Sequence, residues 1–180
     1  MLSAADIRHA KGQRRLAMLT AYDYPTALAL DQVGLDMILV GDSVAMVELG
    51  FPTTRDATLA MMVHHVHAVR TGAVTTHIVG DMPAGSYENP VQALRTAHAL
   101  IAAGADSVKL EGPCLDEVRA IVAAGIAVMG HVGLQPQTAT VFRKEGKTPE
   151  EADRIAREAV QLEQAGCFAV VIEAVPADLA

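Results

Sequence analysis

Apolar runs alternate with amphipathic segments along the chain, and this alternation predicts a regular series of strands and helices. Short apolar runs indicate strands at 16–22, 37–40, 77–80, 107–110, 127–129 and 168–172. Segments with helical spacing lie at 25–33, 58–69, 90–103, 115–124 and 149–165. The first run, Leu16–Tyr22, is expected to be a buried strand. Strands that alternate with helices are typical of βαβ units and a parallel sheet.

Glycine recurs where a predicted helix gives way to the next strand. Gly34, Gly104, Gly125 and Gly166 each follow a helical segment and precede a tight turn into an apolar run. Glycine readily adopts the left-handed backbone that ends a helix. The chain has no linker rich in Pro, Gly and Ser and no low-complexity tract. Residues 1–180 are therefore expected to form one domain of six βα-type units.

Composition supports this architecture and argues against two classes of function, nucleic-acid binding and membrane binding. Hydrophobic residues make up 51% of the chain and aromatic residues only 3%, so the core must be built from aliphatic side chains and methionine. The net charge of −7 argues against electrostatic binding of nucleic acid. No apolar run approaches the roughly 18 residues that span a bilayer, and no basic amphipathic face suits a membrane surface.

Two further features favour a cytoplasmic location. The N-terminal residues 1–15 lack the apolar stretch of a secretory signal. Cys114 and Cys167 have neither metal-binding nor redox spacing, so two reduced, buried thiols are expected.

Polar side chains gather where the predicted strands end, and they supply the candidate chemistry. They lie on or just after strands two to six: Asp42, Asp81, Lys109, Glu111, His131 and Glu173. The carboxyl ends of parallel strands share one face of a domain, and that face carries the active site in such folds. We therefore expect these side chains to converge although they lie far apart in the sequence.

Each of these residues also has an ordinary structural explanation when it is taken alone. Asp42 and Asp81 could cap helices or form turns. Lys109 and Glu111 lie at i and i+2, so they share a strand face and could form a partly exposed ion pair at the strand end. His131 could be a structural histidine with satisfied hydrogen bonds, and Glu173 could cap a helix. Their common position at strand ends favours a functional site.

Three carboxylates, those of Asp42, Asp81 and Glu111, form a group of hard oxygen donors. Oxygen ligands without cysteine favour Mg²⁺ over a softer metal. Without a cation, repulsion between nearby carboxylates would raise the pKa of at least one of them. Lys109 beside this group would suit an anionic substrate carboxylate, and Glu173 is free to act as a base.

Two other segments have more than one interpretation. His64 and His67 lie at i and i+3 of a helix with His65 between them, and this spacing could bind a metal. The polar face of an amphipathic helix is the favoured explanation. The charged stretch 143–151 is either a solvated loop or a mobile lid over the site.

Five motifs taken together resemble the ketopantoate hydroxymethyltransferase family. They are Thr20-Ala-Tyr-Asp-Tyr-Pro25, Leu39-Val-Gly-Asp-Ser43, Val108-Lys-Leu-Glu-Gly112, Gly130-His-Val-Gly-Leu-Gln-Pro-Gln137 and Ile172-Glu-Ala-Val-Pro176. The resemblance extends in unbroken order from about residue 20 to residue 180. It implies an α/β fold, the TIM (β/α)8 barrel of the phosphoenolpyruvate/pyruvate type, and assembly as a homo-oligomer.

The resemblance also implies roles for the matching positions. Asp42 and Asp81 correspond to Mg²⁺ ligands, and Glu111 corresponds to a carboxylate of the metal shell. Asp42, Ser43, Asp81 and Lys109 correspond to positions that bind the ketoacid.

The implied reaction belongs to pantothenate biosynthesis. Mg²⁺ acts as a Lewis acid on 3-methyl-2-oxobutanoate, and Glu173 corresponds to the general base that removes its C3 proton. The resulting carbon nucleophile attacks the one-carbon unit of 5,10-methylenetetrahydrofolate, and the product is 2-dehydropantoate. His131 corresponds to a residue that lines the site.

The sequence departs from the family pattern in its loops and in its length. Ala45, Phe51, Ala84-Gly85 and the segment 142–147 differ from the usual residues, and these changes bear on loop closure and folate handling. The 180 residues fall short of the roughly 250 of a full barrel. The family's strands seven and eight have no counterpart here, so strands one and six are expected to be sheet edges beside an exposed apolar flank.

Two alternatives to this activity stay open at the level of sequence. One is a truncated, non-catalytic fragment or paralogue that keeps the site residues and lacks a closed barrel. The other is a related lyase with the same metal-enolate chemistry, against which the motif 130–137 argues.

Overall fold

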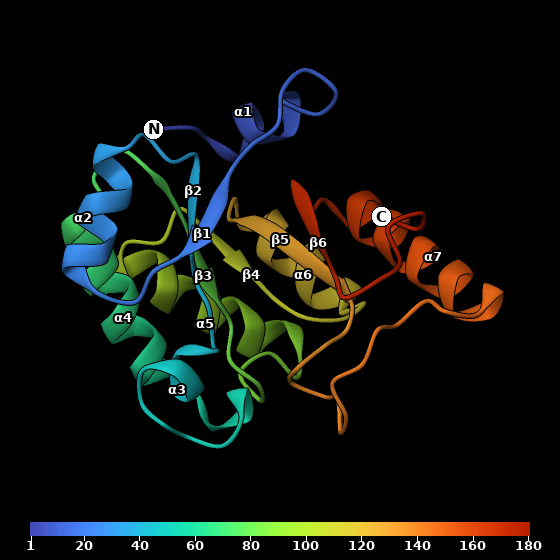
Figure 1. The fold of residues 1–180 in the computed structure, drawn as a ribbon. Coiled ribbons are helices and arrows are strands. Elements are labelled where there is room, and N and C mark those ends of the chain that lie inside the picture. The colour runs from blue at the N-terminus through green and yellow to red at the C-terminus, as the bar shows by residue number, and fades with distance from the viewer.

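Six parallel strands form one curled sheet in the computed structural model, which describes all 180 residues (Figure 1). Their spatial order is their sequence order, and every neighbouring pair is parallel. The strands are β1 (Met18–Thr20), β2 (Met37–Val40), β3 (His77–Asp81), β4 (Ser107–Lys109), β5 (Ala127–Gly133) and β6 (Ala169–Glu173). The predicted parallel sheet of six βα-type units is confirmed.

Five helices of nine or more residues cover the outer face of the sheet (Figure 1). They are α2 (Tyr24–Gln32), α4 (Leu59–Gly72), α5 (Pro90–Ala103), α6 (Leu115–Ala123) and α7 (Pro149–Ala165). Three short helical segments were not predicted: α1 (Ala4–His9), α3 (Val44–Val47) and the 3-10 turn η1 (Thr54–Asp56). Each is too short to show a helical repeat. In Figure 1, α1 and α3 lie at opposite ends of the sheet.

Helix boundaries follow local signals that the sequence carries. The long helix α7 begins after Thr148, whose side chain accepts a hydrogen bond from the backbone N–H of Glu151, and Pro149 occupies its first position. It ends at Gly166, which has a φ of +110°. In this left-handed conformation a side chain would be strained, and a Cβ would also lie 2.9 Å from Val122.

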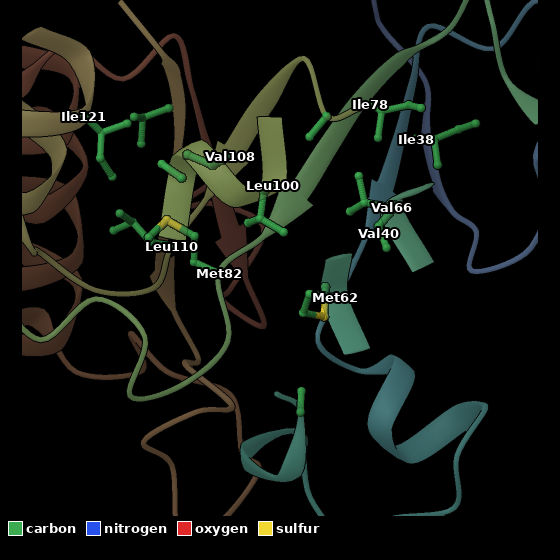
Figure 2. Close-up of a cluster of buried hydrophobic side chains, with 14 of the residues drawn as sticks. Ile38, Val40, Met62, Val66, Ile78, Met82, Leu100, Val108, Leu110 and Ile121 are labelled. Atoms are coloured by element: carbon green, nitrogen blue, oxygen red, sulfur yellow. The ribbon is translucent and has the colours of Figure 1, made fainter. Parts of the chain in front are cut away.

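The main hydrophobic core lies between the outer face of the sheet and these helices (Figure 2). It contains 27 buried residues, and alternate positions of β2 and β3, such as Ile38 and Ile78, point into it. Val66 of α4 and Leu100 of α5 pack against them from the helical layer. Aliphatic and methionine side chains fill this core, as the low aromatic content predicts.

The concave face of the sheet carries a smaller apolar cluster beneath a polar layer. Ile7 of α1 packs there with Met37, Val79 and Met129. Side chains on one strand face recur every two residues, so Asp81 follows Val79 on the same face and His131 follows Met129. The cluster thus forms an apolar floor under the polar side chains at the strand ends.

The first strand differs from its prediction. Leu19 of β1 is 54% exposed, so β1 is not the buried strand that its apolar run indicated. It pairs only with β2 and β6 pairs only with β5, which confirms that the first and last strands are the sheet edges. A cleft of about 840 Å³, lined mainly by apolar side chains, lies between α1 and the α7–β6 unit. The expected apolar flank is therefore exposed.

Two strand ends also differ from their predicted bounds. His131 lies inside β5 and not after it, because β5 pairs with β6 as far as Gly133 and Glu173. Glu111 lies two residues beyond the end of β4 at Lys109. The thiols of Cys114 and Cys167 are both free, but Cys114 is only partly buried. No helix is long and apolar enough to cross a membrane.

Candidate active site

A buried ion pair lies at the centre of the strand ends. Asp81 of β3 and Lys109 of β4 are register partners, so their side chains leave the same face of the sheet side by side. The ammonium Nζ of Lys109 lies 2.7 and 2.8 Å from the two carboxylate oxygens of Asp81. The two side chains are 4% and 2% exposed. Lys109 therefore forms a buried pair across two strands, and not the partly exposed pair with Glu111 that was the alternative explanation.

Asp42 and Ser43 join this pair from the loop that follows β2. The backbone N–H of Asp42 donates to Oδ2 of Asp81 at 3.3 Å, and the Asp42 side chain is buried. Asp42 does not cap α3, whose N-cap position is Ser43 and has no capping bond from its side chain. The hydroxyl of Tyr22 lies 2.7 Å from Oγ of Ser43 and fixes its position. The capping explanation for Asp42 is therefore wrong.

His131 lies between two glutamates on the other side of the site. Its Nδ1 is 3.6 Å from Oε1 of Glu111, and its Nε2 is 3.3 Å from Oε2 of Glu173. The histidine side chain is 1% exposed, and neither ring nitrogen makes a hydrogen bond. His131 is therefore not a structural histidine whose hydrogen bonds are all made, which was the alternative explanation for this residue.

Glu173 differs from the other carboxylates in its exposure. Its side chain is 41% exposed, whereas those of Asp81 and Glu111 are 2% and 3% exposed. Ala174 follows with a φ of +50°, and it is the one non-glycine residue with positive φ. Strained backbone of this kind concentrates at functional sites. The turn leaves the carboxylate at the strand end, where a substrate can reach it.

Gly133 explains how this turn packs against the neighbouring loop. Its φ is +88°, and a Cβ at this position would lie 2.3 Å from the backbone oxygen of Glu173. That oxygen accepts a hydrogen bond from the N–H of Leu134 at 3.0 Å. Only glycine permits such a close approach. The Gly-His-Val-Gly sequence therefore supplies His131 and also the glycine against which the backbone of Glu173 packs.

The electrostatics of the site are those of crowded, buried carboxylates. Burial raises the pKa of Asp42 to about 7, and the negative charge of Asp81 adds to this effect. Burial likewise raises the pKa of Glu111 to about 7, although Lys109 opposes the shift. Burial acts to lower the pKa of Lys109, but the hydrogen bonds and negative charge of Asp81, together with the charges of Glu111 and Asp42, outweigh it and the pKa is raised. Three carboxylates thus share one ammonium group.

The donor set fits a divalent cation by its chemistry. It offers carboxylate oxygens in a buried site, and its fully ionised form has one positive group for three negative groups. However, no group of three or more His, Cys, Asp or Glu side chains is spaced so that all could hold one ion. Asp42, Asp81 and Glu111 are the residues that would hold such a cation.

Sequence reasoning missed two residues of this site. Gln137, which is 5% exposed, contacts both Asp42 and Glu111. The hydroxyl of Tyr87 donates to the side-chain oxygen of Gln137 and accepts a long 3.4 Å hydrogen bond from the N–H of Glu111. Both residues also line a pocket of about 310 Å³ at the strand ends. Gln137 is the last residue of a motif singled out in the sequence, which was the available signal.

The two other segments weighed in the sequence lie outside this cluster. In α4, Nδ1 of His65 lies 2.7 Å from the backbone oxygen of Tyr22, and the histidines form no metal-binding group. In the charged stretch, Arg143 pairs with Glu151 at 3.2 Å and with Glu145 at 3.4 Å. His64 and His67 are exposed on α4, which agrees with the helix-face explanation, and the lid stays a prediction.

Comparison with known proteins identifies the family. The family model described as ketopantoate hydroxymethyltransferase matches residues 2–180. This chain belongs to the ketopantoate hydroxymethyltransferase family. The resemblance inferred from the five motifs is thereby confirmed.

Two curated relatives of the family illustrate the extent of the match. The 3-methyl-2-oxobutanoate hydroxymethyltransferase of Oleidesulfovibrio alaskensis is 50% identical over 99% of this chain and 64% of its own length. The protein of the same name from Thermus thermophilus is 51% identical over 97% of this chain and 69% of its own length. The chain thus spans about two thirds of the length of these relatives.

Solved structures of distant proteins share the fold. Phosphonopyruvate hydrolase, determined with oxalate and Mg²⁺, has a TM-score of 0.74 at 14% identity and matches 96% of this chain and 64% of its own. 2,3-Dimethylmalate lyase, of the PEP mutase/isocitrate lyase superfamily, has a TM-score of 0.70 at 16% identity over 96% and 63% of the two chains. At such identities the likeness concerns the fold alone, and it confirms the predicted barrel-type α/β class.

Proposed function

We propose that this chain transfers a hydroxymethyl group from 5,10-methylenetetrahydrofolate to 3-methyl-2-oxobutanoate and so forms 2-dehydropantoate. Membership of the family and the names of the curated relatives support this proposal. The observation that carries it is the contrast among the carboxylates: Glu173 is partly exposed, while the others are buried around Lys109. We also propose that the chain works as a homo-oligomer, as the resemblance implies, and that it does so in the cytoplasm, as its N-terminal composition and its cysteines favour.

Glu173 is the proposed general base. A base must reach the proton it removes, and Glu173 is the carboxylate of this group that solvent and substrate can reach. It takes the proton from C3 of the ketoacid, and the electron pair of that C–H bond remains on the carbon skeleton as the enolate. The Nε2 atom of the buried His131 lies 3.3 Å from this carboxylate.

Lys109 and Ser43 are the proposed contacts for the ketoacid. The ammonium group of Lys109 is the one cation among buried carboxylates, and the hydroxyl of Ser43 is held by Tyr22. An anionic substrate would meet a site in which negative groups outnumber positive ones. A divalent cation held by Asp42, Asp81 and Glu111 would offset that charge and supply Lewis-acid polarisation of the keto oxygen.

The transfer itself conserves atoms as follows. A carbon–carbon bond forms between C3 of the ketoacid and the methylene carbon of the folate. The methylene carbon loses its two bonds to folate nitrogens, and a water molecule supplies the oxygen of the new hydroxyl group. Tetrahydrofolate leaves with the protons required by its nitrogens. No oxidant or reductant takes part, because the transferred carbon is formally reduced by as much as C3 of the ketoacid is oxidised.

A steady-state assay of tetrahydrofolate release tests this proposal. The purified 180-residue chain is given Mg²⁺, the ketoacid and methylenetetrahydrofolate, and Glu173→Gln serves as the matched variant. We expect release that depends on the ketoacid and falls at least about 100-fold in the variant, the lower range for loss of a general base. Circular dichroism and size-exclusion chromatography verify that both proteins are folded.

The competing explanations give different results in the same assay. A folded chain without turnover would contradict the proposal and support a non-catalytic role. Folate-independent cleavage of a branched 2-hydroxy acid would support a lyase instead.

A further inference from the structure

Gln137 connects the parts of the site more extensively than any residue assigned to it above. Its backbone N–H donates to Oε2 of Glu111 at 3.0 Å. Its side-chain Nε2 donates to Oδ2 of Asp42 at 2.8 Å and to the backbone oxygen of Met82 at 3.0 Å. Its side-chain oxygen accepts a hydrogen bond from the hydroxyl of Tyr87. The backbone N–H of Gln137 and both polar atoms of its side-chain amide thus make hydrogen bonds to other residues of the site.

These partners come from three different strand ends. Asp42 follows β2, Met82 follows β3 and Glu111 follows β4, whereas Gln137 belongs to the loop after β5. Strand pairing ends before each of these residues. Backbone hydrogen bonds continue a little further, for example from the N–H of Met82 to the oxygen of Lys109 at 2.8 Å, but they hold the backbone and not the side chains. Gln137 ties Asp42 to Glu111 across this gap, because its side-chain amide holds Asp42 and its backbone N–H holds Glu111.

The chemistry of these contacts matters because both carboxylates are buried. Two negative groups in a desolvated site repel each other, and donors placed between them reduce that repulsion. Gln137 uses one oxygen on each carboxylate, Oδ2 of Asp42 and Oε2 of Glu111. The other oxygen of each carboxylate makes no hydrogen bond to Gln137.

We propose that Gln137 is a positioning residue that holds Asp42 and Glu111 for a shared divalent cation, and that Tyr87 acts mainly by fixing the amide of Gln137. The metal part of this inference rests on the proposed function. Because Tyr87 donates to the side-chain oxygen, it sets which end of the amide faces Asp42. Hydrogen-bond partners of metal-binding side chains contribute to affinity in this way.

The first test is independent of any metal. Crystal structures of the parental chain and of Gln137→Met, grown without divalent cations, are compared at the site. Methionine keeps the length of the side chain and removes its donors and acceptor. We expect the Asp42 carboxylate to change its rotamer in the variant. An unchanged carboxylate position would overturn the positioning role.

The second test measures Mg²⁺ affinity by isothermal titration calorimetry without substrates. We expect Gln137→Met to weaken binding by at least about tenfold, the lower range for loss of a partner of a metal-binding side chain. Gln135→Met is the matched control, because Gln135 lies in the same loop and has no side-chain hydrogen bond. It should bind Mg²⁺ like the parental chain.

A double-mutant cycle tests the role of Tyr87. Tyr87→Phe alone should weaken Mg²⁺ binding by about threefold or more, and by less than about twofold when Gln137→Met is already present. Independent, multiplying effects of the two substitutions would overturn the claim that Tyr87 acts through Gln137. Tyr87→Phe also keeps the proposal testable if Gln137→Met does not fold.

Failure of the proposed function is distinguishable from failure of this inference. A parental chain that does not bind Mg²⁺ would contradict the metal part of both, while the crystal structures would still decide the positioning role. Parental Mg²⁺ binding that survives Gln137→Met unchanged would overturn this inference alone.

Discussion

Lys109→Met is expected to destabilise the protein strongly, because it leaves Asp81 as a buried charge without its partner. Methionine keeps an unbranched side chain of nearly the same length, with sulfur in place of one methylene, and removes the ammonium group. In the parental chain this group lies 2.7 and 2.8 Å from the Asp81 oxygens, and both side chains are almost fully buried. The positive charge of the same ammonium opposes the high pKa values of Asp42 and Glu111.

The magnitude follows from the burial of the pair. Removal of one member of a buried ion pair costs about 3–5 kcal/mol, because the remaining charge is desolvated without compensation. A domain of this size has a total stability on the order of 5–15 kcal/mol, so the variant should be marginal. Removal of both charges in Lys109→Met/Asp81→Leu should recover at least about 2 kcal/mol relative to the single variant, since replacing a whole buried pair is often neutral.

Urea unfolding followed by circular dichroism measures these effects. The chain is studied at neutral pH and without divalent cations, and its free energy of unfolding is compared among the parental chain and the two variants. The exposed pair Arg119–Asp116, whose side chains are 58% and 79% exposed, provides the control. Arg119→Met should change the free energy by less than about 1 kcal/mol, as is usual for surface pairs.

One result would refute this reasoning directly. If Lys109→Met lowered the free energy of unfolding by no more than Arg119→Met does, the Lys109–Asp81 pair could not be the dominant electrostatic contact of the site. The same conclusion would follow if the double variant were less stable than the single one.

Three further predictions concern stability and its dependence on pH. Asp31→Ala should destabilise the protein by about 1–2 kcal/mol in urea unfolding, because the carboxylate accepts five hydrogen bonds from residues 74–76. These bonds lower the pKa of Asp31 from 3.8 to about 2 against the effect of burial, so its contribution is present above pH 3.8 and is lost as the pH falls toward 2. Burial lowers the pKa of His77 below 6.5, so the folded chain holds this histidine in its neutral form. The parental chain should therefore lose stability relative to His77→Gln as the pH falls below 6.5. Equal dependence of the free energy of unfolding on pH in the two proteins would contradict this. Gly133→Ala should lower the thermal midpoint by several degrees, because φ is +88° and the new Cβ would meet the Glu173 carbonyl, and an unchanged midpoint would contradict that contact.

Much of the fold could be predicted because its signals are local. The bounds of β2, α5 and α7 match their predictions, since a short apolar run or a Pro start and a Gly end marks each of them. β1 shows the limit of such reasoning. Its apolar sequence indicated burial, yet Leu19 is exposed, because burial depends on what lies beyond the sheet edge. Periodicity carries no information about that neighbour.

The site was predictable for residues that the sheet itself positions. Asp81 and Lys109 converge because parallel register places them side by side. Sequence spacing suggested Glu111 as the partner of Lys109, but spacing along one strand does not show which residue the next strand contributes. Gln137 and Tyr87 were missed because loops bring them to the site, and no repeat along the chain encodes the position of a loop residue.

The most direct test of the proposed chemistry is exchange of the C3 hydrogen of 3-methyl-2-oxobutanoate with D₂O. Proton NMR follows the exchange with the 180-residue chain, Mg²⁺ and no folate, so that only the proton-removal step is observed. We predict exchange by the parental chain that stops when Mg²⁺ is chelated and falls at least about 100-fold in Glu173→Gln. Exchange by Glu173→Gln at the parental rate would contradict the assignment of Glu173 as the base, and a folded parental chain that catalysed no exchange would contradict the proposed function.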